Sequence, residues 1–476
     1  MTDYSKYSFW LETSGDNLTP RPALGQSIDV DVAILGGGYT GLWTAYYLLC
    51  ADPGLKVAVI EKEIVGFGAS GRNGGWCSSK FPVTPAMLEQ RYGGERARAL
   101  MVAMNGAVNE VFRVCQQESI DAHFHKGGIL TLARGEHHLP SLRSAFDAYG
   151  RLGLSQQYQL LSADQARERV CVTNTCGALY ASENASLHPG RLVRGIARAI
   201  EKRGGVIYER TEVVNFEGKS SPRLLTAAGE IRARKAVVLA GESYLTRLAR
   251  LHRVVLPVYS LIVLTEPLTE PQWAEIGWRN RESVASCNCT VDYLTRTADG
   301  RILFGSRGAP YRFGSRISDG QDRHSETHSH IKDTVVEWFP MLKGVKFTHE
   351  WGGPVGMPRD WMPMATFDPA TKIATARGYT GQGVSTTNLT GRILAELIAD
   401  RRTELSQLPI AQRRSPLWEL EPLRWLAARY MQNAFLRIDA AGKQGKRRPK
   451  DAFLAEYWGG TKYLPSPGKP LFPSWA

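Results

Sequence analysis

The chain of 476 residues is 43% hydrophobic and 22% charged, which is the composition of a globular protein and too much chain for one small core. Its formal net charge is +13, but the 59 basic residues are spread along the chain, and the one dense run, KQGKRRPK, lies near the end at 443–450. A solvated surface accounts for this pattern better than a groove that reads nucleic acid, so we expect no nucleic-acid partner.

The seven cysteines are odd in number and form no CxxC pair, which argues against a disulfide framework and predicts a reducing, cytoplasmic location. The opening residues MTDYSKYSFWLETSGD contain no apolar secretory segment. Residues 32–50, VAILGGGYTGLWTAYYLLC, carry no charge, but three consecutive glycines interrupt them after four apolar residues. A buried strand, a turn and a buried helix fit this stretch better than a membrane span.

The glycines of that stretch form a dinucleotide fingerprint. Gly36, Gly38 and Gly41 lie between a short apolar strand and a helix, and a second strand, LKVAVIE, ends at Glu61. In such a unit one glycine makes the tight turn, one lets the backbone reach a pyrophosphate, and one lets the helix pack on the strand, while the acid binds a ribose. The carboxylate disfavours NADP, but the fingerprint does not distinguish FAD from NAD.

A second glycine-rich segment, GFGASGRNGG at 66–75, follows the acid. Nicotinamide enzymes need no such loop, whereas the flat ring of FAD has to lie against the main chain, and glycine permits that approach. Ser70 and Asn73 would add hydrogen bonds, and Arg72 a positive charge. A flexible surface turn is the alternative interpretation of this segment.

Residues 372–399, KIATARGYTGQGVSTTNLTGRILAELIA, again predict a strand, a glycine-rich turn and a helix. The cluster from Ser385 to Asn388 is suited to capping a helix, so we expect the helix to begin there. Directed at the pyrimidine edge of a flavin, this N-terminus would stabilise the anion that forms on reduction. A plain strand-to-helix junction is the alternative.

The middle of the chain alternates between the two kinds of element. Residues 185–217 predict a turn, an amphipathic helix and a strand, residues 230–244 a further strand, and VYSLIVLTEPL and DYLTRTADGRILFGSRG strand-like runs, the latter with a turn at Asp299-Gly300. We expect an α/β (α+β) fold in which a split Rossmann-like domain carries a second domain inserted twice. The predicted segments are 1–85, 181–248 and 349–402 for the Rossmann-like domain, 86–180 and 249–348 for the inserted domain, and 403–476 for a C-terminal helical, basic extension.

The fingerprint, the GFGASGRNGG segment and the closing GYTGQGVSTTNLTGRILAELI together resemble the D-amino-acid oxidase and sarcosine oxidase superfamily, in particular its γ-glutamylputrescine oxidase-like branch. The resemblance covers about residues 7–400. It implies an FAD-binding domain with an antiparallel-sheet domain over the flavin, and a small amine or amino acid, N-alkylated in some relatives, as substrate. It also implies hydride transfer from the amine-bearing carbon to flavin N5, hydrolysis of the imine to an aldehyde or ketone, and reoxidation by O2 with release of H2O2.

Carried over residue by residue, the resemblance implies the following cofactor-binding set: Gly36, Gly38, Tyr39, Thr40, Gly41, Glu61, Lys62, Gly68, Ala69, Ser70, Gly71, Arg72, Asn73, Gly74, Gly75, Val213, Gly241, Gly381, Gln382, Gly383, Val384, Ser385 and Thr386. Val213 would contact adenine through its backbone, and Gly241 would lie near the phosphates. The residues from Gly381 to Thr386 would meet the pyrimidine ring.

Two features depart from the family pattern. The region WGGPVGMPRDWMPM at 351–364 has no cysteine to hold the flavin, so we expect non-covalent FAD. The lysine that related enzymes place over the flavin has no counterpart, because GRILFGSRG places Leu303 and Phe304 there. The alternatives to an oxidase are therefore a dehydrogenase that passes electrons to a quinone or carrier, and a flavin monooxygenase, although we find no second nucleotide site or exchange motif for the latter.

Hydride transfer needs a neutral amine, and aromatic walls disfavour its ammonium form. Tyr259 and Tyr293 are our candidate catalytic aromatics, with Tyr311, Trp351 and Trp361 as further wall candidates. A position in the core is the alternative for each of them.

A bidentate arginine is the natural anchor for a substrate carboxylate. Arg307 and Arg359 are the candidates that we place in the site, with Arg312 as a third. The histidines of HSETHSH at 324–330 have no fitting carboxylate pattern around them, so we expect no metal.

The C-terminal extension contains a helix-like stretch at 422–439. The expected apolar stripe, with Arg424 and Gln432 elsewhere, consists of Leu423, Leu426, Ala427, Tyr430, Met431 and Ala434. We favour a helix that packs on the protein's own surface or in a dimer contact, and the alternative is a helix on an anionic membrane that delivers electrons to quinone. The sequence does not predict an oligomeric state.

Overall fold

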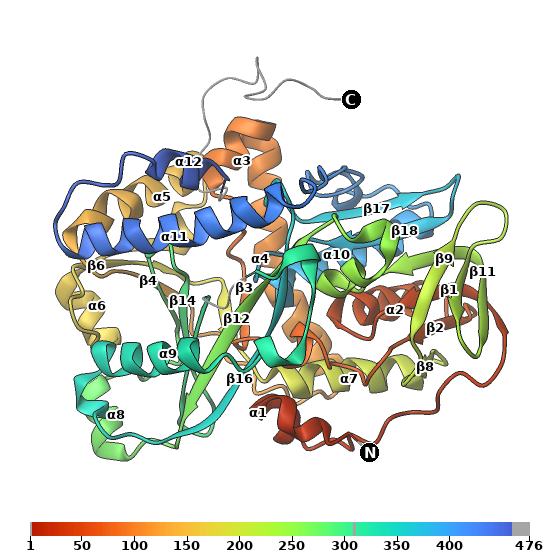
Figure 1. Cartoon of the computed structure of the whole chain (residues 1–476), viewed down its shortest axis with the longest axis horizontal. Coiled ribbons are helices and arrows are strands. Elements are labelled where there is room, and N and C mark those ends of the chain that lie inside the picture. The colour runs from red at the N-terminus through yellow and green to blue at the C-terminus, as the bar shows by residue number, and fades with distance from the viewer. Residues whose placement is uncertain (1, 308–310, 459–476) are drawn as a thin grey trace.

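The computed structural model describes residues 2–307 and 311–458, which form two lobes, each built around an eight-stranded sheet (Figure 1). A third, two-stranded sheet consists of β3 (Trp76–Ser78) and β7 (Asn184–Ser186). The fold class predicted from the sequence is confirmed, since parallel and antiparallel sheets occur together with a helical C-terminal region.

The first sheet has a parallel centre in the order β18-β11-β1-β2-β8, with β17 antiparallel at one edge and the β9–β10 hairpin beside β11. Strand β2 is buried along its whole length, as its run of aliphatic residues predicts for a parallel strand covered on both faces. The strands are β1 (Ile28–Leu35), β2 (Val57–Ile60), β8 (Val206–Tyr208), β9 (Val213–Glu217), β10 (Arg223–Thr226), β11 (Gly229–Leu239), β17 (Met364–Asp368) and β18 (Ile373–Arg377).

The second sheet runs in the order β16-β12-β15-β14-β13-β4-β6-β5 and is antiparallel except between β13 and β4. The strand-like runs predicted at 258–268 and 292–308 are confirmed as strands in their main parts, β12 and the β14–β15 hairpin. The hairpin turn falls at Asp299-Gly300, where Gly300 has φ +77°. The strands are β4 (Ile129–Ala133), β5 (Tyr158–Ser162), β6 (Gly177–Ala181), β12 (Leu256–Thr265), β13 (Ser283–Ser286), β14 (Asp292–Arg296), β15 (Ile302–Arg307) and β16 (Phe347–Met357).

Helices cover both sheets, and α2 and α10 pack against each other in the first lobe. Helix α2 buries ten of its 13 residues because it is apolar on nearly every side, and it packs against α10, α7 and the sheet. The helices are α1 (Phe9–Glu12), α2 (Tyr39–Ala51), α3 (Pro85–Tyr92), α4 (Gly94–Gln117), α5 (Leu139–Arg151), α6 (Ala163–Arg169), α7 (Pro189–Lys202), α8 (Glu270–Ile276), α9 (Ser325–Trp338), α10 (Gly383–Ile398), α11 (Leu423–Lys443) and α12 (Ala452–Trp458).

The predicted domain boundaries stay a prediction. Most strands of each sheet come from the segments that the sequence assigns to one domain. Strand β16 crosses the predicted boundary between 348 and 349 and pairs with β12 of the second sheet.

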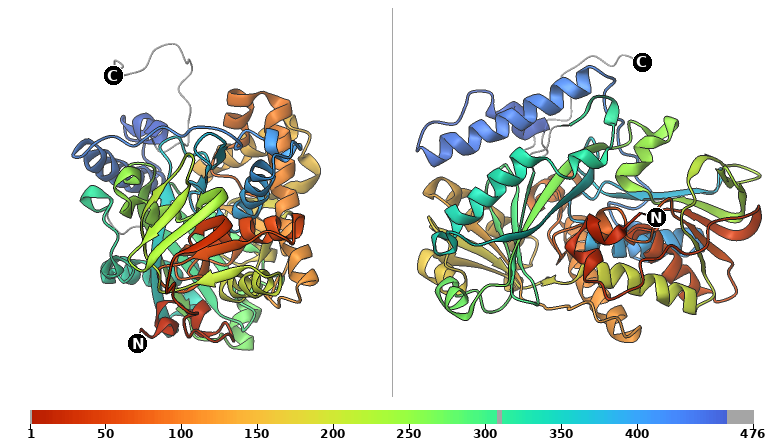
Figure 2. Two further views of the ribbon diagram at one scale, coloured as in Figure 1. Left: turned by 90° about the vertical axis from the view of Figure 1, so that its right-hand side faces the viewer. Right: turned by 60° about the horizontal axis from the view of Figure 1, so that its bottom comes forward.

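The C-terminal helix packs on the protein itself, and the predicted stripe is confirmed at Met431 and Ala434, which are buried, but is wrong at its start. Helix α11 lies along the second lobe (Figures 1 and 2) and buries Arg424 to 1% exposure, whereas Leu423 and Leu426 are 62% and 53% exposed. Arg424 is buried because it pairs with Glu421 and donates to the His252 carbonyl at 3.0 Å, which hydropathy alone does not reveal. Within the described residues, no helix has both the length and the apolar character needed to cross a bilayer.

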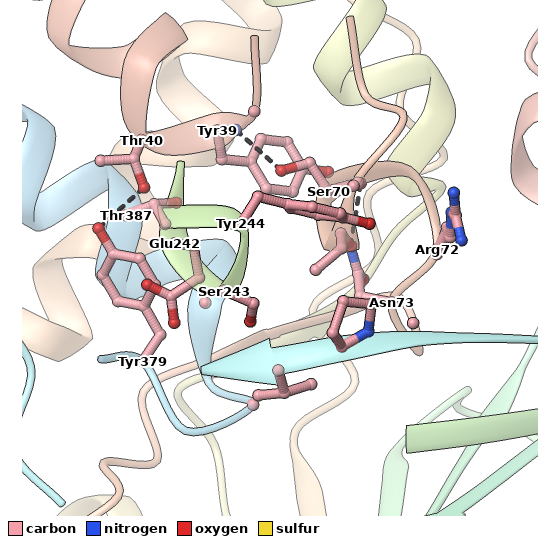
Figure 3. A pocket seen from close by; sticks show the side chains of 18 of the residues that line it. Tyr39, Thr40, Ser70, Arg72, Asn73, Glu242, Ser243, Tyr244, Tyr379 and Thr387 are labelled. Atoms are coloured by element: carbon pink, nitrogen blue, oxygen red, sulfur yellow. Dashed lines mark hydrogen bonds between the residues drawn. The ribbon is translucent and has the colours of Figure 1, made fainter. Parts of the chain in front are cut away.

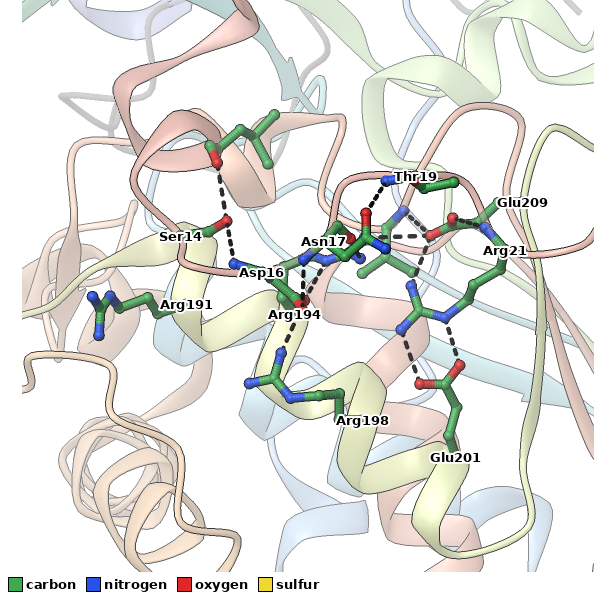
Figure 4. Close-up of polar contacts among 12 residues, drawn as sticks. Ser14, Asp16, Asn17, Thr19, Arg21, Arg191, Arg194, Arg198, Glu201 and Glu209 are labelled. Atoms are coloured by element: carbon green, nitrogen blue, oxygen red, sulfur yellow. Dashed lines mark hydrogen bonds and ion pairs between the residues drawn. The ribbon is translucent and has the colours of Figure 1, made fainter. Parts of the chain in front are cut away.

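The N-terminal segment is held to the first lobe by a buried carboxylate, Glu209 (Figure 4). This side chain accepts the Arg21 N–H at 2.6 Å and the Val65 N–H at 2.7 Å. The guanidinium groups of Arg21 and Arg194 lie 3.0 and 3.5 Å from it. Glu209 therefore joins the N-terminal segment, α7 and the chain that leads into the loop at 66–75.

We expect Glu209→Gln to lower the free energy of unfolding by about 1–3 kcal/mol, because it removes a buried charged acceptor. The loss stays moderate because Arg21 keeps its pair with Glu201 and Arg194 keeps its pair with Asp16. Denaturant unfolding measures the change. The matched control is Glu217→Gln, which breaks the half-exposed pair with Arg223 and should cost less than about 1 kcal/mol. Equal losses in the two variants would contradict the role of Glu209.

Candidate active site

A cavity of about 340 Å³ lies between the two sheets. Leu35, Ile60 and Ala240 line it where β1, β2 and β11 end, and Ser260 and Tyr293 line it from the second sheet. Ligands of parallel α/β sheets bind outside the carboxyl ends of the strands, so this is the expected place for a nucleotide.

The first glycine turn is shaped so that only glycine fits. Gly36 has φ +107°, and a Cβ there would lie 2.7 Å from the Ala240 carbonyl oxygen. A Cβ on Gly41 would lie 2.1 Å from the Gly36 carbonyl oxygen, which explains the close contact of helix and strand. Gly38 is the N-cap of α2 and provides no side-chain cap, so the N-terminus of the helix can receive an anion.

Glu61 follows β2 directly and is held in place by the backbone. Its Oε2 accepts the Gly37 N–H at 2.7 Å, and its Oε1 accepts the Glu63 N–H at 3.0 Å. Burial raises the pKa of the Glu61 carboxyl. Lys62 lines the same end of the cavity and pairs with Glu212 at 2.6 Å.

The loop at 66–75 lies against the N-terminus of α2 (Figure 3). The Ser70 Oγ accepts the Tyr39 N–H at 2.8 Å, and Asn73 Nδ2 donates to the Ala69 and Ser70 carbonyls at 3.1 Å. A Cβ on Gly71 would lie 2.3 Å from the Gly66 carbonyl oxygen. These contacts fix the loop beside α2, so the alternative interpretation of a flexible surface turn is wrong.

Arg72 lines the cavity, but its charge is neutralised within the protein. Its Nη1 lies 2.6 Å from the Asp322 carboxylate, its Nε donates to the Phe67 carbonyl at 2.7 Å, and its side chain is 1% exposed. The free cation expected from the sequence is therefore an ion pair that links the loop to the segment before α9.

Helix α10 begins at Gly383, two residues before the predicted cap, and its N-cap residue is Gln382. The expectation that Ser385 to Asn388 cap the helix is wrong, because these side chains are buried inside it. Thr386 Oγ1 donates to the Gln382 carbonyl at 2.6 Å, and Ser385 donates to the Ser78 carbonyl. The N-cap residue of α10 provides no side-chain cap, so this N-terminus faces the cavity with N–H groups available to a ligand, whereas at α2 the Tyr39 N–H already donates to Ser70.

The structure brings most of the predicted cofactor set together. The predicted residues that line the cavity are Gly36, Gly38, Tyr39, Thr40, Glu61, Lys62, Gly68, Ala69, Ser70, Arg72, Asn73, Gly74, Val213, Gly241, Gly381, Gln382, Gly383 and Val384. Gly41, Gly71, Gly75, Ser385 and Thr386 are not among the lining residues and act through packing or local hydrogen bonds.

Several lining residues were missed from the sequence. Tyr379 is buried, and its hydroxyl lies 2.8 Å from Thr40 Oγ1 and 3.1 Å from Thr390 Oγ1, so it joins α2 to α10 (Figure 3). Trp76, Lys80 and Glu242 also line the cavity. The sequence signal for these three residues was their position. Trp76 and Lys80 follow the glycine-rich loop, and Glu242 follows the end of β11 at Leu239.

Glu242 is a buried carboxyl at a positive φ of 46°, and its Oε2 accepts the Gly378 N–H at 3.0 Å. Burial raises the pKa of Glu242 to about 7. Between pH 4.5 and about 7 the unfolded chain has therefore lost this proton while the folded protein keeps it.

We expect the free energy of unfolding to fall across that window by on the order of 3 kcal/mol and to level off above it. Glu242→Gln carries no titrating group, so this part of the pH dependence should vanish in denaturant unfolding between pH 4.5 and 8. A variant with the wild-type slope would show that another group titrates.

On the side of the second sheet, Tyr293 is the predicted catalytic residue that lines the cavity. Its hydroxyl lies 2.8 Å from Ser260 Oγ, and its ring meets Trp76 edge-on at 5.9 Å. A Cβ on Gly74 would lie 2.5 Å from the Tyr293 ring, so the ring lies directly over the glycine-rich loop.

The other predicted substrate contacts lie elsewhere. Tyr259 is on the opposite face of β12, because side chains alternate along a strand, and its hydroxyl accepts the Ser318 N–H at 3.0 Å. Arg359 pairs with Glu419 at 3.0 Å. Trp351 packs in the core, and Tyr311 donates to Glu421. The Arg307 side chain lies outside the described residues.

The residues present fit a flavin dinucleotide. Two helix N-termini whose N-cap residues provide no side-chain cap, a carboxylate at the end of β2 and turns that no Cβ would allow converge on one cavity. Open N–H groups suit a pyrophosphate and the anionic edge of a reduced flavin. The fold and the site thus define a dinucleotide-binding protein whose cavity suits a flavin.

Comparison with known proteins identifies the family. Residues 31–397 match the model of the FAD dependent oxidoreductase family, to which this chain belongs. It is therefore an FAD-binding oxidoreductase.

Relatives and solved structures agree with this assignment. Gamma-glutamylputrescine oxidoreductase of Escherichia coli (strain K12) is 32% identical over 415 residues, which cover 86% of this chain and 93% of the relative. The crystal structure of glycine oxidase from Geobacillus kaustophilus superposes with a TM-score of 0.64 at 23% identity and covers 81% of this chain and 99% of that one. L-proline dehydrogenase from P. horikoshii gives a TM-score of 0.66 at 20% identity, over 82% of this chain and 96% of that one.

Proposed function

We propose that this protein oxidises a small amine or amino acid, N-alkylated or not, with O2 as acceptor and H2O2 as product. The observation that supports this most is the continuity of the cavity. It runs from Glu61 to a wall of the second sheet at Tyr293, so one continuous cavity borders both the proposed cofactor residues and the proposed substrate wall. The similarity to a gamma-glutamylputrescine oxidoreductase supports the amine class.

Bound non-covalently, FAD would supply a two-electron oxidant that takes a hydride from the amine-bearing carbon at N5, and the imine product would hydrolyse to an aldehyde or ketone. The chain would hold it with Glu61 at the ribose, the N-terminus of α2 at the pyrophosphate and the N-terminus of α10 at the pyrimidine ring. We propose these roles for the lining residues of the predicted cofactor set. Gly41, Gly71 and Gly75 would support them through packing.

The substrate wall combines apolar and polar groups. Ile262, Val355 and Trp76 disfavour an ammonium and so favour the neutral amine that hydride loss requires. Lys80, which lines this part of the cavity, is the cation that we propose for a substrate carboxylate, in place of Arg359.

An anaerobic titration of the purified yellow protein tests the proposal. The panel contains N-methyl amino acids, D- and L-amino acids, polyamine derivatives and aminophosphonates. We expect one compound to bleach the flavin absorbance, and O2 admitted afterwards to restore it with one H2O2 per flavin. Bleaching that only a quinone or carrier reverses would support the alternative, a dehydrogenase. A flavin that no amine bleaches would overturn the amine chemistry.

Two matched variants test the substrate wall. We expect Tyr293→Phe to lower kcat/KM for the bleaching amine about tenfold, because one hydrogen bond in a buried pocket contributes roughly 1–1.5 kcal/mol. Tyr259→Phe makes the same change on the opposite face of the sheet and should stay within about twofold of the wild type. Steady-state kinetics measure both, and equal effects would place the substrate away from Tyr293.

We also propose that the protein works in the cytoplasm. All seven cysteines are free thiols, which suits a reducing compartment. Fractionation of the cells of origin would test this location.

A further inference from the structure

The turn between β13 and β14, residues 287–291, faces two ways. Asn288 and Val291 line the cavity. Cys289 packs against the cluster of Ala434, Ile438, Ala452 and Ala455 between α11 and α12. One short turn is therefore shared by the cavity and the C-terminal extension.

A carboxylate of the extension holds this turn. Asp439 of α11 is 9% exposed, and its Oδ1 accepts the Cys289 N–H at 2.9 Å. Its Oδ2 accepts the Thr290 N–H at 2.8 Å and the Thr290 hydroxyl at 2.5 Å. Hydrogen bonds to an ionised acceptor are stronger than those between neutral groups. The Asp439 carboxylate accepts three of them, from two successive residues of the turn.

A second carboxylate completes the arrangement from inside the sheet. Asp292 accepts the Ser286 hydroxyl at 2.9 Å and Asn288 Nδ2 at 2.8 Å. This bond engages one of the two N–H groups of the Asn288 side-chain amide and fixes the amide, so its oxygen Oδ1 is an acceptor that the turn can offer to the cavity. Such an oxygen suits an N–H donor of a substrate.

The family match ends at residue 397, so the extension is a feature of this chain beyond the matched region. Helix α11 runs along the second lobe from Leu423, and near its other end Lys443 pairs with Glu337 at 3.3 Å (Figure 1). Before Asp439 the helix is attached by the bond from Arg424 to the His252 carbonyl, and after Asp439 by the Lys443–Glu337 pair. These contacts give the Asp439 carboxylate a fixed place over the turn.

We propose that Asp439 is a positioning residue for substrate binding: through the turn at 287–291, the C-terminal helix sets the wall of the cavity that receives the N–H-bearing part of an amine. This inference rests on the proposed amine oxidation. Its scope is substrate affinity, because the turn leads directly into β14 and lines the cavity on the side of the second sheet, next to Tyr293.

The test compares FAD-loaded wild type, Asp439→Asn and the control Asp451→Asn. The control makes the same change in the same extension, where Asp451 pairs with Arg437 at 2.6 Å and accepts the Tyr430 hydroxyl at 2.8 Å, so its bonds go to α11. Steady-state kinetics use the amine found by anaerobic bleaching, and hydrogen–deuterium exchange follows the amides of residues 289 and 290.

For Asp439→Asn we expect faster exchange at both amides, a KM raised at least about fivefold, a kcat within about twofold and an unchanged FAD content. The control should match the wild type in all four. Thr290→Val removes one of the three hydrogen bonds from the turn and should raise KM by a smaller factor. This variant still tests the inference if Asp439→Asn disturbs the packing of α11.

Two results would overturn this inference while the wild type still oxidised the amine. One is unchanged exchange at the amides of residues 289 and 290 in Asp439→Asn. The other is faster exchange there with an unchanged KM in both Asp439→Asn and Thr290→Val. A raised KM in the Asp451 control would overturn it too, because any loosening of the extension would then be enough. A wild type that no amine bleaches would overturn the proposed function, and this inference with it.

Discussion

Gly38→Val should yield a folded protein that purifies without yellow colour. Gly38 lines the cavity at the N-terminus of α2, with φ −88° and ψ −179°, which valine adopts without strain. The one neighbour that a Cβ would meet within 4 Å is Ser70 Oγ at 3.0 Å, the end of a short side chain. The added methyl groups would occupy the space where a pyrophosphate meets the helix N–H groups.

We expect the affinity for FAD to fall on the order of 100-fold, or about 2.7 kcal/mol, measured by titrating the apoprotein with FAD. Gly38 is a better position for this test than two glycines of the loop. A Cβ on Gly74 would meet the Tyr293 ring at 2.5 Å, and Gly75 has φ +77° with the Leu187 carbonyl oxygen 2.7 Å from its added Cβ. Valine at either position would damage the fold and the site together.

The matched control is Gly106→Val, on the exposed side of α4, where an added Cβ meets nothing within 4 Å. It should bind FAD as the wild type does. Full flavin occupancy in Gly38→Val, with a normal unfolding transition, would show that the pyrophosphate does not lie at the N-terminus of α2.

Arg72→Met should lower the free energy of unfolding by about 3–5 kcal/mol. The guanidinium pairs with Asp322 at 2.6 Å, and the two side chains are 1% and 10% exposed. Removing Arg72 takes from a largely buried carboxylate the guanidinium that lies 2.6 Å from it. The Phe67 carbonyl also loses the donor that fixes the start of the glycine-rich loop.

A double-mutant cycle separates charge from packing. Arg72→Met with Asp322→Leu removes both charges and should recover all but about 1–2 kcal/mol of the loss, measured by urea unfolding at saturating FAD. Arg113→Met breaks a pair on the surface of α4, where Arg113 is 54% exposed, and should cost less than about 1 kcal/mol. A double variant as unstable as the sum of the two single variants would show that the pair itself contributes little.

Local sequence patterns predicted the nucleotide half of the site well. The turn at Gly36 and Gly41 requires glycine because of the backbone that surrounds it within the same strand-turn-helix unit. Glu61 lies at the end of the neighbouring parallel strand. Such units form from contiguous chain, so spacing alone places their parts.

The substrate half could not be predicted in this way. Tyr259 and Tyr293 are both strand tyrosines, and what separates them is which face of the second sheet meets the first lobe. The charge of Arg72 is neutralised by Asp322, 250 residues away along the chain. No local pattern encodes either relation, because both depend on how the two lobes pack.

The sequence by itself therefore determined the α/β class, the glycine turns beside the cavity, the place of Glu61 at the end of β2 and, through the family resemblance, the flavin cofactor. The tertiary structure alone decided which aromatic residues and charges reach the cavity, where α10 begins, and that the C-terminal helix buries Arg424 and holds the turn at 287–291 through Asp439. The physical reason is how far apart along the chain the interacting residues lie. Turns and strand-helix units follow from neighbours in the chain, whereas burial, ion pairing and cavity walls follow from contacts that only the folded chain creates.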